Sequence, residues 1–376
     1  MVTVIIFLIV LAILIFVHEL GHFLFAKMFG IRVDAFKIGF GPKIFAWTPK
    51  DKHGKKGETE YGLNLIPFGG YVKIFGENPD AESTLGVDHK RSMVHKKKWQ
   101  QIIVLAGGVL FNAIFAWILY SGLFFFGGNV PIDAFVGYSQ YFSNPHIIVV
   151  DSNKDFPAEK AGIGIGDVIE TITSKGQTSE IKDVTVIQNI INTSAGEPIT
   201  FKYIKNGQEN TVQVTPVTGL VAGKYAIGIA MDRVAYVKMP FLTSIVEGFK
   251  YTLITIRDMV VGLYTFITGF FYQTSSLSDV AGPIGIAIII KNAMQLGFAY
   301  LLIVVALISA NLAIINLIPF PALDGGRIFF LLIEAVIRRP IPSKFANWAN
   351  LIGFALLMLF MLVITYHELM TKIFGN

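Results

Sequence analysis

The chain has 376 residues, of which 53% are hydrophobic and only 15% charged, and its mean hydropathy is +0.60. This composition excludes an ordinary soluble globular protein and indicates a membrane protein with several spans and one soluble module. There is no cysteine, so disulfides and thiolate ligands are excluded, and any metal must be held by His, Asp or Glu. The net charge of +5 says little until it is placed by segment.

Four segments are long and apolar enough to cross a bilayer, which takes about 20 residues. They are residues 3–26, 102–126, 298–318 and 349–366. The first has no basic n-region and runs past the length of a signal h-region, so no cleavable signal is expected. Residues 241–272 space their charges as an amphipathic helix in the membrane interface would, and the alternative is a fifth span.

Charge placement predicts the orientation of the chain. Residues 27–100 hold 14 Lys and Arg against 8 Asp and Glu, whereas residues 129–243 hold 9 against 11. By the positive-inside rule, 27–100 and 319–348 face the cytoplasm, while 129–243 and both termini lie on the other side. The basic stretch 89–100 is expected to rest on anionic lipid.

Two parts of the chain outside the spans have patterns of their own. Residues 31–100 read as short strands and hairpins, oily enough to dip into the membrane. Residues 146–216 alternate strand, short-helix and turn signals and end in a hairpin at Asn206-Gly207, which predicts a small α/β module. The predicted parts are a first transmembrane helix at 1–30, a cytoplasmic membrane-associated β-region at 31–100, a second transmembrane helix at 101–127, an extracytoplasmic module at 128–220, a linker and amphipathic interfacial helix at 221–295, and the third and fourth transmembrane helices at 296–376.

The first span contains the sequence HELGH at 18–22. Positions i and i+4 share one face of a helix, so His18 and His22 can ligate one ion. Glu19 stands beside them, free to act on a water, which completes the H-E-x-x-H zinc signature. Gly21 leaves room for another backbone or a peptide to approach. The alternative, two histidines satisfied by polar neighbours, is weakened by their place inside a span.

A catalytic zinc needs three protein ligands and an open position, and the first span offers no further ligand downstream. Asp324 is the candidate, in the stretch NLIPFPALDGGR. Pro319 and Pro321 break a helix there, and Gly325-Gly326 permit a tight turn. Irregular backbone at membrane depth is tolerated only where it is buried in protein or lines a cavity. Asp324 could alternatively cap the helix that follows, and the two roles could coexist.

Five motifs, in chain order, carry a resemblance to a known family. They are HELGH (18–22), IGFGPKIFAW (38–47), LIPFGGYVKIFGE (65–77), DVAGPIGIA (279–287) and NLIPFPALDGGR (316–327). Over nearly its whole length the sequence resembles the site-2 protease family of intramembrane zinc metalloproteases, of the bacterial RseP/RasP type. The resemblance implies a Zn2+ cofactor held by His18, His22 and Asp324, with Glu19 as the catalytic base of peptide-bond hydrolysis.

The resemblance also implies how substrate is held. The implied substrate-binding residues are Asn316, Asn311, Asn112, Gly69 and Gly70. The β-region at 31–75 would pair with an unwound substrate segment by strand addition. The module at 128–220 resembles one PDZ domain, where some relatives carry two in tandem. Gly108 stands where relatives often have proline.

The expected fold is thus a polytopic α-helical membrane protein of about four transmembrane helices, with a membrane-associated β-hairpin region and one extracytoplasmic PDZ-like α/β domain. The expected activity is cleavage of single-span membrane proteins, such as anti-sigma factors or signal-peptide remnants, in the bacterial inner membrane. Membrane lipids are expected partners, nucleic acid is not, and the oligomeric state is open. A metal transporter would need several coordinating stations, and a catalytically dead scaffold would not need Glu19 and Asp324.

Overall fold

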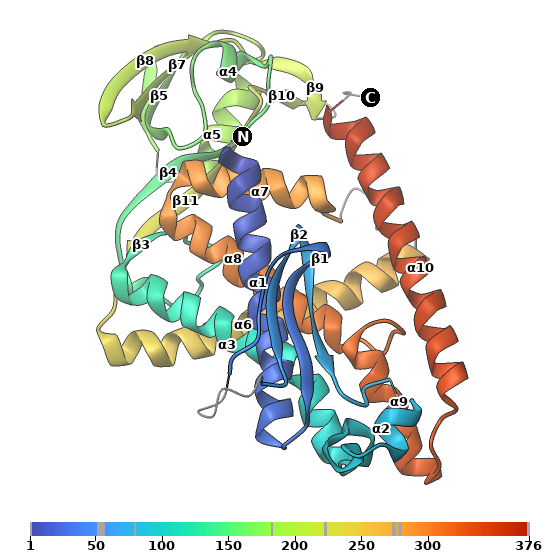
Figure 1. Ribbon diagram of the computed structural model, residues 1–376. Coiled ribbons are helices and arrows are strands. Elements are labelled where there is room, and N and C mark those ends of the chain that lie inside the picture. Colours follow the sequence, from blue (N-terminus) through green and yellow to red (C-terminus); the bar gives the residue numbers. More distant parts are fainter. Residues whose placement is uncertain are drawn as a thin grey trace. The chain divides into compact units, whose positions relative to one another are not determined.

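The computed structural model describes residues 2–50, 57–78, 80–181, 183–221, 224–272, 276 and 280–373. Residues 51–56 of the predicted β-region and Asp279, which opens the motif at 279–287, lie outside these ranges. The chain divides into two compact units (Figure 1). The first comprises Met1–Leu119, Phe249–Ala287 and Val305–Asn376, and the second comprises Tyr120–Gly248 and Ile288–Val304.

Five helices in the described ranges are long and apolar enough to cross a membrane. They are α1 (Val2–Met28), α3 (Lys98–Phe126), α6 (Phe241–Phe271), α8 (Phe298–Leu317) and α10 (Ser343–Glu368). The shorter helices are α2 (Ala81–Leu85), α4 (Pro157–Lys160), α5 (Val184–Thr193), α7 (Pro283–Leu296) and α9 (Asp324–Ile337). Single turns of 3-10 or π helix occupy His89–Arg91, Met93–His95, Ser139–Tyr141 and Leu369–Ile373.

Each of the four predicted spans lies almost wholly within one of the long helices. The mixed segment at 241–272 forms the single helix α6, whose 31 residues extend for about 46 Å at 1.5 Å per residue. Its length and composition therefore meet the requirements for a span. Both assignments of α6, as a span and as an interfacial helix, stay predictions.

The β-region of the first unit is a two-stranded antiparallel sheet of β1 (Val33–Trp47) and β2 (Glu60–Ile74), interrupted by several register shifts. One end of this sheet is buried in a cluster with α1 and α3, consisting of Ala26, Ile31, Val33, Phe36, Val72, Ile74, Met93, Val104 and Leu105. The other end exposes large apolar side chains, namely Phe40, Ile44, Phe45, Leu63, Leu65 and Ile66. An oily, exposed sheet end agrees with the sequence prediction of a β-region suited to the membrane.

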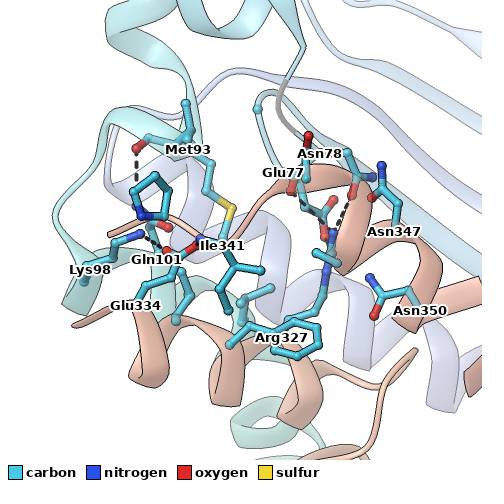
Figure 2. Close-up of a pocket in the computed structure, with 18 residues that line it drawn as sticks. Glu77, Asn78, Met93, Lys98, Gln101, Arg327, Glu334, Ile341, Asn347 and Asn350 are labelled. Atoms are coloured by element: carbon cyan, nitrogen blue, oxygen red, sulfur yellow. Dashed lines mark hydrogen bonds and ion pairs between the residues drawn. The ribbon is translucent and has the colours of Figure 1, made fainter. Parts of the chain in front are cut away.

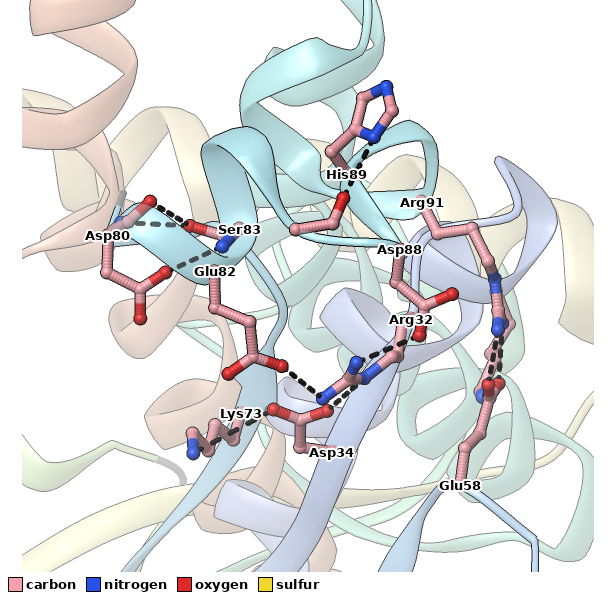
Figure 3. A network of polar contacts seen from close by, with 12 residues as sticks. Arg32, Asp34, Glu58, Lys73, Asp80, Glu82, Ser83, Asp88, His89 and Arg91 are labelled. Atoms are coloured by element: carbon pink, nitrogen blue, oxygen red, sulfur yellow. Dashed lines mark hydrogen bonds and ion pairs between the residues drawn. The ribbon is translucent and has the colours of Figure 1, made fainter.

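A network of ion pairs anchors the buried end of this sheet to the segment that leads into α3 (Figure 3). Arg32 donates through Nε to Asp34 Oδ1 at 2.7 Å and through Nη1 to Asp88 Oδ2 at 3.0 Å. Arg91 donates to both carboxylate oxygens of Glu58, and this pairing lowers the pKa of Glu58 to about 2. The strands are therefore fixed at their base by charge and left apolar at their tips.

The second unit is built on a seven-stranded sheet with strand order β3-β11-β4-β5-β7-β8, in which β6 also pairs with β5. Its strands are β3 (Gly128–Pro131), β4 (Phe142–Ser152), β5 (Val168–Ser174), β6 (Gln177–Glu180), β7 (Ile199–Lys205), β8 (Gln208–Val214) and β11 (Ile229–Val237), while β9 (Val217–Val221) pairs with β10 (Lys224–Ala226). The core between α5 and the sheet is apolar and includes Ile147, Val149, Ile172, Ile187, Ile199 and Phe201. All elements predicted between residues 146 and 216 are present, and Asn206 and Gly207 have φ values of 51° and 78° in the turn between β7 and β8.

The sheet extends beyond the predicted module at both ends of the sequence. The region 221–295, predicted as a linker and a helix, contains β11, which pairs with both β3 and β4. The sequence IAMDRVAYV hides this strand because Asp232 and Arg233 interrupt its apolar pattern. Its partner strands lie far away in the chain, so no local hairpin signal marks it.

Candidate metal centre

The two histidines of HELGH lie on one face of α1, as their spacing requires. Their Nε2 atoms are 3.2 Å apart, and the rings meet edge to face with centroids 4.8 Å apart. When both imidazoles are neutral and carry their protons on Nδ1, neither Nε2 atom has a hydrogen to donate to the other. Two Nε2 lone pairs this close therefore point to a common cation between them.

Asp324, from the other end of the chain, completes the cluster. Its Oδ2 lies 3.1 Å from His18 Nε2 and 3.3 Å from His22 Nε2. Asp324 is the first residue of α9, and the N-cap position belongs to Leu323, whose side chain makes no capping bond. The alternative role of Asp324 as an N-cap residue is therefore not observed.

The turn before α9 carries Asp324 to the histidines. Ala322 has a φ of 77°, which a residue with a side chain rarely adopts, and its N–H donates to Asn350 Oδ1 at 3.2 Å. A Cβ on Gly325 would lie 2.3 Å from the carbonyl oxygen of Leu317, and one on Gly326 would lie 2.2 Å from that of Phe320. The two glycines are thus needed for close packing on backbone carbonyls, while the left-handed residue of the turn is Ala322.

The geometry of these three residues fits a zinc ion. Ligand distances of 2.0–2.2 Å in a tetrahedral site place neighbouring ligand atoms about 3.4 Å apart, and the three separations here are 3.1, 3.2 and 3.3 Å. Asp324 Oδ2 is also buried without a hydrogen-bond partner in the described part of the chain. Three protein ligands leave one position open, as in catalytic rather than structural zinc sites.

The backbone of α3 orients His22. Its Nδ1 lies 2.9 Å from the carbonyl oxygen of Val104, which can only accept, so Nδ1 carries the proton and Nε2 presents its lone pair to the cluster. The ring of His22 is buried. Its tautomer is thus fixed before any metal arrives.

Asn112 performs the corresponding role for His18, and this differs from the substrate contact expected for it. Asn112 is completely buried, and its side-chain amide lies 3.2 Å from His18 Nδ1. The amide atom placed there is Nδ2. With a metal on Nε2, Nδ1 carries the proton, and turning the amide over brings Oδ1, which has no partner among the residues described, into position to accept it. Ser309 donates to the backbone carbonyl of Asn112 at 2.8 Å and holds it from α8.

Glycines let α1 and α3 approach at the cluster. A Cβ on Gly21 would lie 2.1 Å from the carbonyl oxygen of Gly107, and one on Gly107 would lie 2.6 Å from that of Gly21. The room expected beside Gly21 is thus filled by the backbone of α3. Gly108 faces the imidazoles, and a Cβ there would lie 2.5 Å from His18 Cε1 and 2.6 Å from His22 Nε2.

Glu19 lies between the histidines and strand β2. The backbone N–H of Val72 donates to its carboxylate. A Cβ on Gly70 would be 3.6 Å from Glu19 Cγ, whereas one on Gly69, at a φ of 115°, would strike the ring of Phe40. Gly70 therefore marks the point where the strand passes Glu19.

The remaining predicted residues lie on α8. Asn316 is half-buried and Asn311 exposed, and no hydrogen bond joins either of them to the His–Asp cluster within the described ranges. Sequence reasoning missed the contributions of Val104 and Gly108. The adjacent glycines at 107 and 108 were the available signal, since small residues allow close helix packing in membranes.

Comparison with known proteins agrees with this geometry. A model of Peptidase family M50 matches residues 6–360. The chain is 34% identical to a putative zinc metalloprotease of Clostridium perfringens and 31% identical to the zinc metalloprotease RasP of Geobacillus kaustophilus, with 96% of each chain covered in both cases. A putative zinc metalloprotease of Mesorhizobium japonicum is 30% identical over 96% of this chain and 97% of its own. The similarity therefore extends over nearly the full length of the chain.

Proposed function

Since the chain belongs to Peptidase family M50, the site-2 protease family, and is a zinc metalloprotease, we propose that it cleaves single-span membrane proteins within or near the bilayer. The observation that carries this proposal is the position of His18 and His22 in the C-terminal half of α1, a helix apolar and long enough to span, with Asp324 against them. Anti-sigma factors and signal-peptide remnants are the proposed substrates.

In this proposal His18, His22 and Asp324 hold the zinc, which when bound polarises the scissile carbonyl and activates water. Glu19, held by the Val72 amide beside the ligands, takes the proton of the attacking water and returns it to the leaving amine. Val104 and Asn112 keep both imidazoles in the metal-binding orientation.

A helical substrate must unwind before its carbonyls can react, because they are tied in i→i−4 hydrogen bonds. Strand β2 supports a way to do this. Its residues 70–74 pair with residues 33–38 of β1 along one edge, and Gly70 passes Glu19. A substrate strand added beside β2 would exchange helical hydrogen bonds for strand hydrogen bonds at the catalytic base. Asn316 and Asn311 stay proposed substrate contacts.

We infer that the sheet unit acts as a single PDZ domain on the extracytoplasmic side of a bacterial inner membrane protein with several spans. A groove of about 420 Å³ supports this inference. It runs between α5, which contributes Gln188 and Asn192, and the strands β10 and β11, which contribute Tyr225 and Ile229. An extended peptide terminus fits between a helix and a strand in this way.

The decisive experiment uses proteoliposomes that contain the full chain and a single-span substrate. Glu19→Gln should lower the cleavage rate about 1,000-fold while the bound zinc is unchanged, because the base is lost and the ligands stay. The double variant His18→Ala/His22→Ala should lose the zinc, and Glu58→Gln serves as a matched control. Cleavage by Glu19→Gln at the wild-type rate would refute the protease proposal. Zinc flux across the liposomes that survives Glu19→Gln would favour the transporter instead.

A further inference from the structure

Arg327 lies one helical turn after Asp324 on α9, so both side chains share one face of that helix. Arg327 lines two cavities, of about 160 and 590 Å³, and Asp324 lines the larger one. Only 23% of the Arg327 side chain is exposed, although it carries a full charge. A charge so enclosed requires partners, since desolvation otherwise costs several kcal/mol.

Among the described residues, the partners of the Arg327 side chain are Glu77 and Asn78, which lie three and four residues beyond the end of strand β2 (Figure 2). Nη1 forms an ion pair with Glu77 Oε1, and Nη2 donates to Asn78 Oδ1 at 2.9 Å and to the Glu77 carbonyl oxygen at 3.4 Å. The planar fork of an arginine holds several acceptors in fixed directions, whereas the ammonium of a lysine acts as a rotatable point charge. The contact therefore fixes direction as well as distance.

The segment that receives Arg327 is itself rigid. Gly76 has a φ of 77°, and a Cβ there would lie 1.8 Å from Ser92 Oγ. The N–H of Met93 donates to the carbonyl of Phe75 at 2.8 Å, and that of Glu77 donates to the carbonyl of Ile74 at 3.2 Å. Glu77 thus offers Arg327 an anchored carboxylate at the end of β2.

The same strand contacts the catalytic base further back, where the Val72 amide donates to Glu19 and Gly70 passes its Cγ. The C-terminal part of β2 is therefore bonded to Glu19, and the segment that follows it is bonded to the helix of Asp324. The Arg327–Glu77 pair closes this loop of contacts.

From these contacts we propose that Arg327 and Glu77 are positioning residues. They hold Asp324, the proposed third zinc ligand, and the part of β2 beside Glu19 at the relative positions that cleavage requires. The proposal rests on the protease function given above. Neither residue touches the reacting atoms. The pair acts through Asp324 on one side and through β2 and Glu19 on the other.

A second ion pair on the same helix provides a control. Lys98 of α3 pairs with Glu334, which lies almost three turns beyond Asp324 and lines the smaller cavity. Figure 2 shows this pair across the cavity from Arg327. The pair joins α9 to α3 rather than to β2. Lys98→Met therefore removes an ion pair of α9 and leaves the contact between Arg327 and Glu77 in place.

The test measures kcat, KM and bound zinc for the full chain in proteoliposomes. Arg327→Gln and Glu77→Gln should each lower kcat at least tenfold, leave KM within threefold and keep one zinc per chain. The double variant should be no worse than either single variant, because both remove one contact. Arg327→Lys, which keeps the charge and loses the fork, should fall between Arg327→Gln and the wild type. Lys98→Met should keep a kcat within twofold of the wild type.

The proposal is overturned if Arg327→Gln or Glu77→Gln keeps the wild-type kcat, or if the effects of the two multiply in the double variant. It is also overturned if Lys98→Met loses as much, or if lost zinc or lost folded protein accounts for the whole fall in cleavage. Glu19→Gln, run alongside, separates these outcomes from failure of the protease function: wild-type cleavage by that variant would refute the function whatever Arg327 does.

Discussion

The first compact unit, here called the helical unit, and the second, the sheet unit, distribute polar and apolar side chains in opposite ways. In the sheet unit the interior is a cluster of aliphatic and aromatic side chains around Phe201 and Ile187. In the helical unit many large apolar side chains lie on the outside, and His22, Asn112 and Ser309 lie buried within. The first arrangement is stabilised by water exclusion. The second, with an apolar surrounding, depends on close backbone contact and on satisfied polar groups.

The difference shows which kind of change each unit tolerates. A core of apolar side chains loses free energy in proportion to the volume removed from it. A polar centre between close-packed helices responds to volume that is added. Three variants, beginning with the one expected to disturb the metal centre most, test whether this contrast holds.

Gly108→Ala should have the largest effect on the metal centre, although it adds only one methyl group. The new Cβ would lie within 2.7 Å of both imidazoles, so the rings must move away from the cluster or the helices must separate. We expect zinc affinity to fall about 100-fold, as when the support of a ligand is lost. Competition with a chelator measures this. Gly122→Ala on the same helix, where a Cβ meets nothing within 4 Å, should bind zinc normally. Equal affinities for the two variants would contradict the contrast.

Phe201→Ala removes volume from the sheet unit and should act there alone. Phe201 is completely buried, and its loss should lower the free energy of unfolding of this unit by about 4 kcal/mol. Hydrogen exchange followed by mass spectrometry should show faster exchange in β5, β7 and β8. Zinc stoichiometry should stay at the wild-type value. Loss of zinc in this variant would show that the two units do not respond separately.

Glu58→Gln should have the smallest effect, and the effect should depend on pH. Arg91 and Lys27 lower the pKa of Glu58 from 4.5 to about 2, so the carboxylate stabilises the fold fully above pH 4.5 and loses this contribution as the pH falls through 2. Because a third of the side chain is exposed, the variant should cost on the order of 0.5 kcal/mol at pH 7. Thermal unfolding at several pH values measures it. A difference that grows toward acid pH would have the wrong sign.

Local sequence spacing predicts the proposed metal ligands but not the groups that position them. The i, i+4 rule alone predicts that His18 and His22 lie side by side, and the motif around Asp324 marks a break in a helix. Neither pattern reveals Val104, because every residue type has a backbone carbonyl. The glycine pair at 107 and 108 indicates close helix packing but not that Gly108 faces the two imidazoles. The expected role of Asn112 was substrate binding, and only its burial against His18 shows its partner.

The fold follows the same division. Segments with a continuous apolar pattern, such as α1 and α8, were predicted to within a few residues, and so was the turn at Asn206-Gly207. Strand β11 was missed because its register depends on β3 and β4 rather than on its own pattern. The pairing of Arg327 with Glu77 joins residues that only the folded chain brings together.

The backbone contact between Gly21 and Gly107 has a consequence for how the gene can vary. Every single-base missense change in a glycine codon introduces a side chain, and at this contact any side chain begins with a Cβ that collides with a carbonyl oxygen. No single-base missense change at either position is therefore expected to be neutral. A side chain gained at one glycine cannot be offset by a smaller residue at the other, because glycine is already the smallest residue.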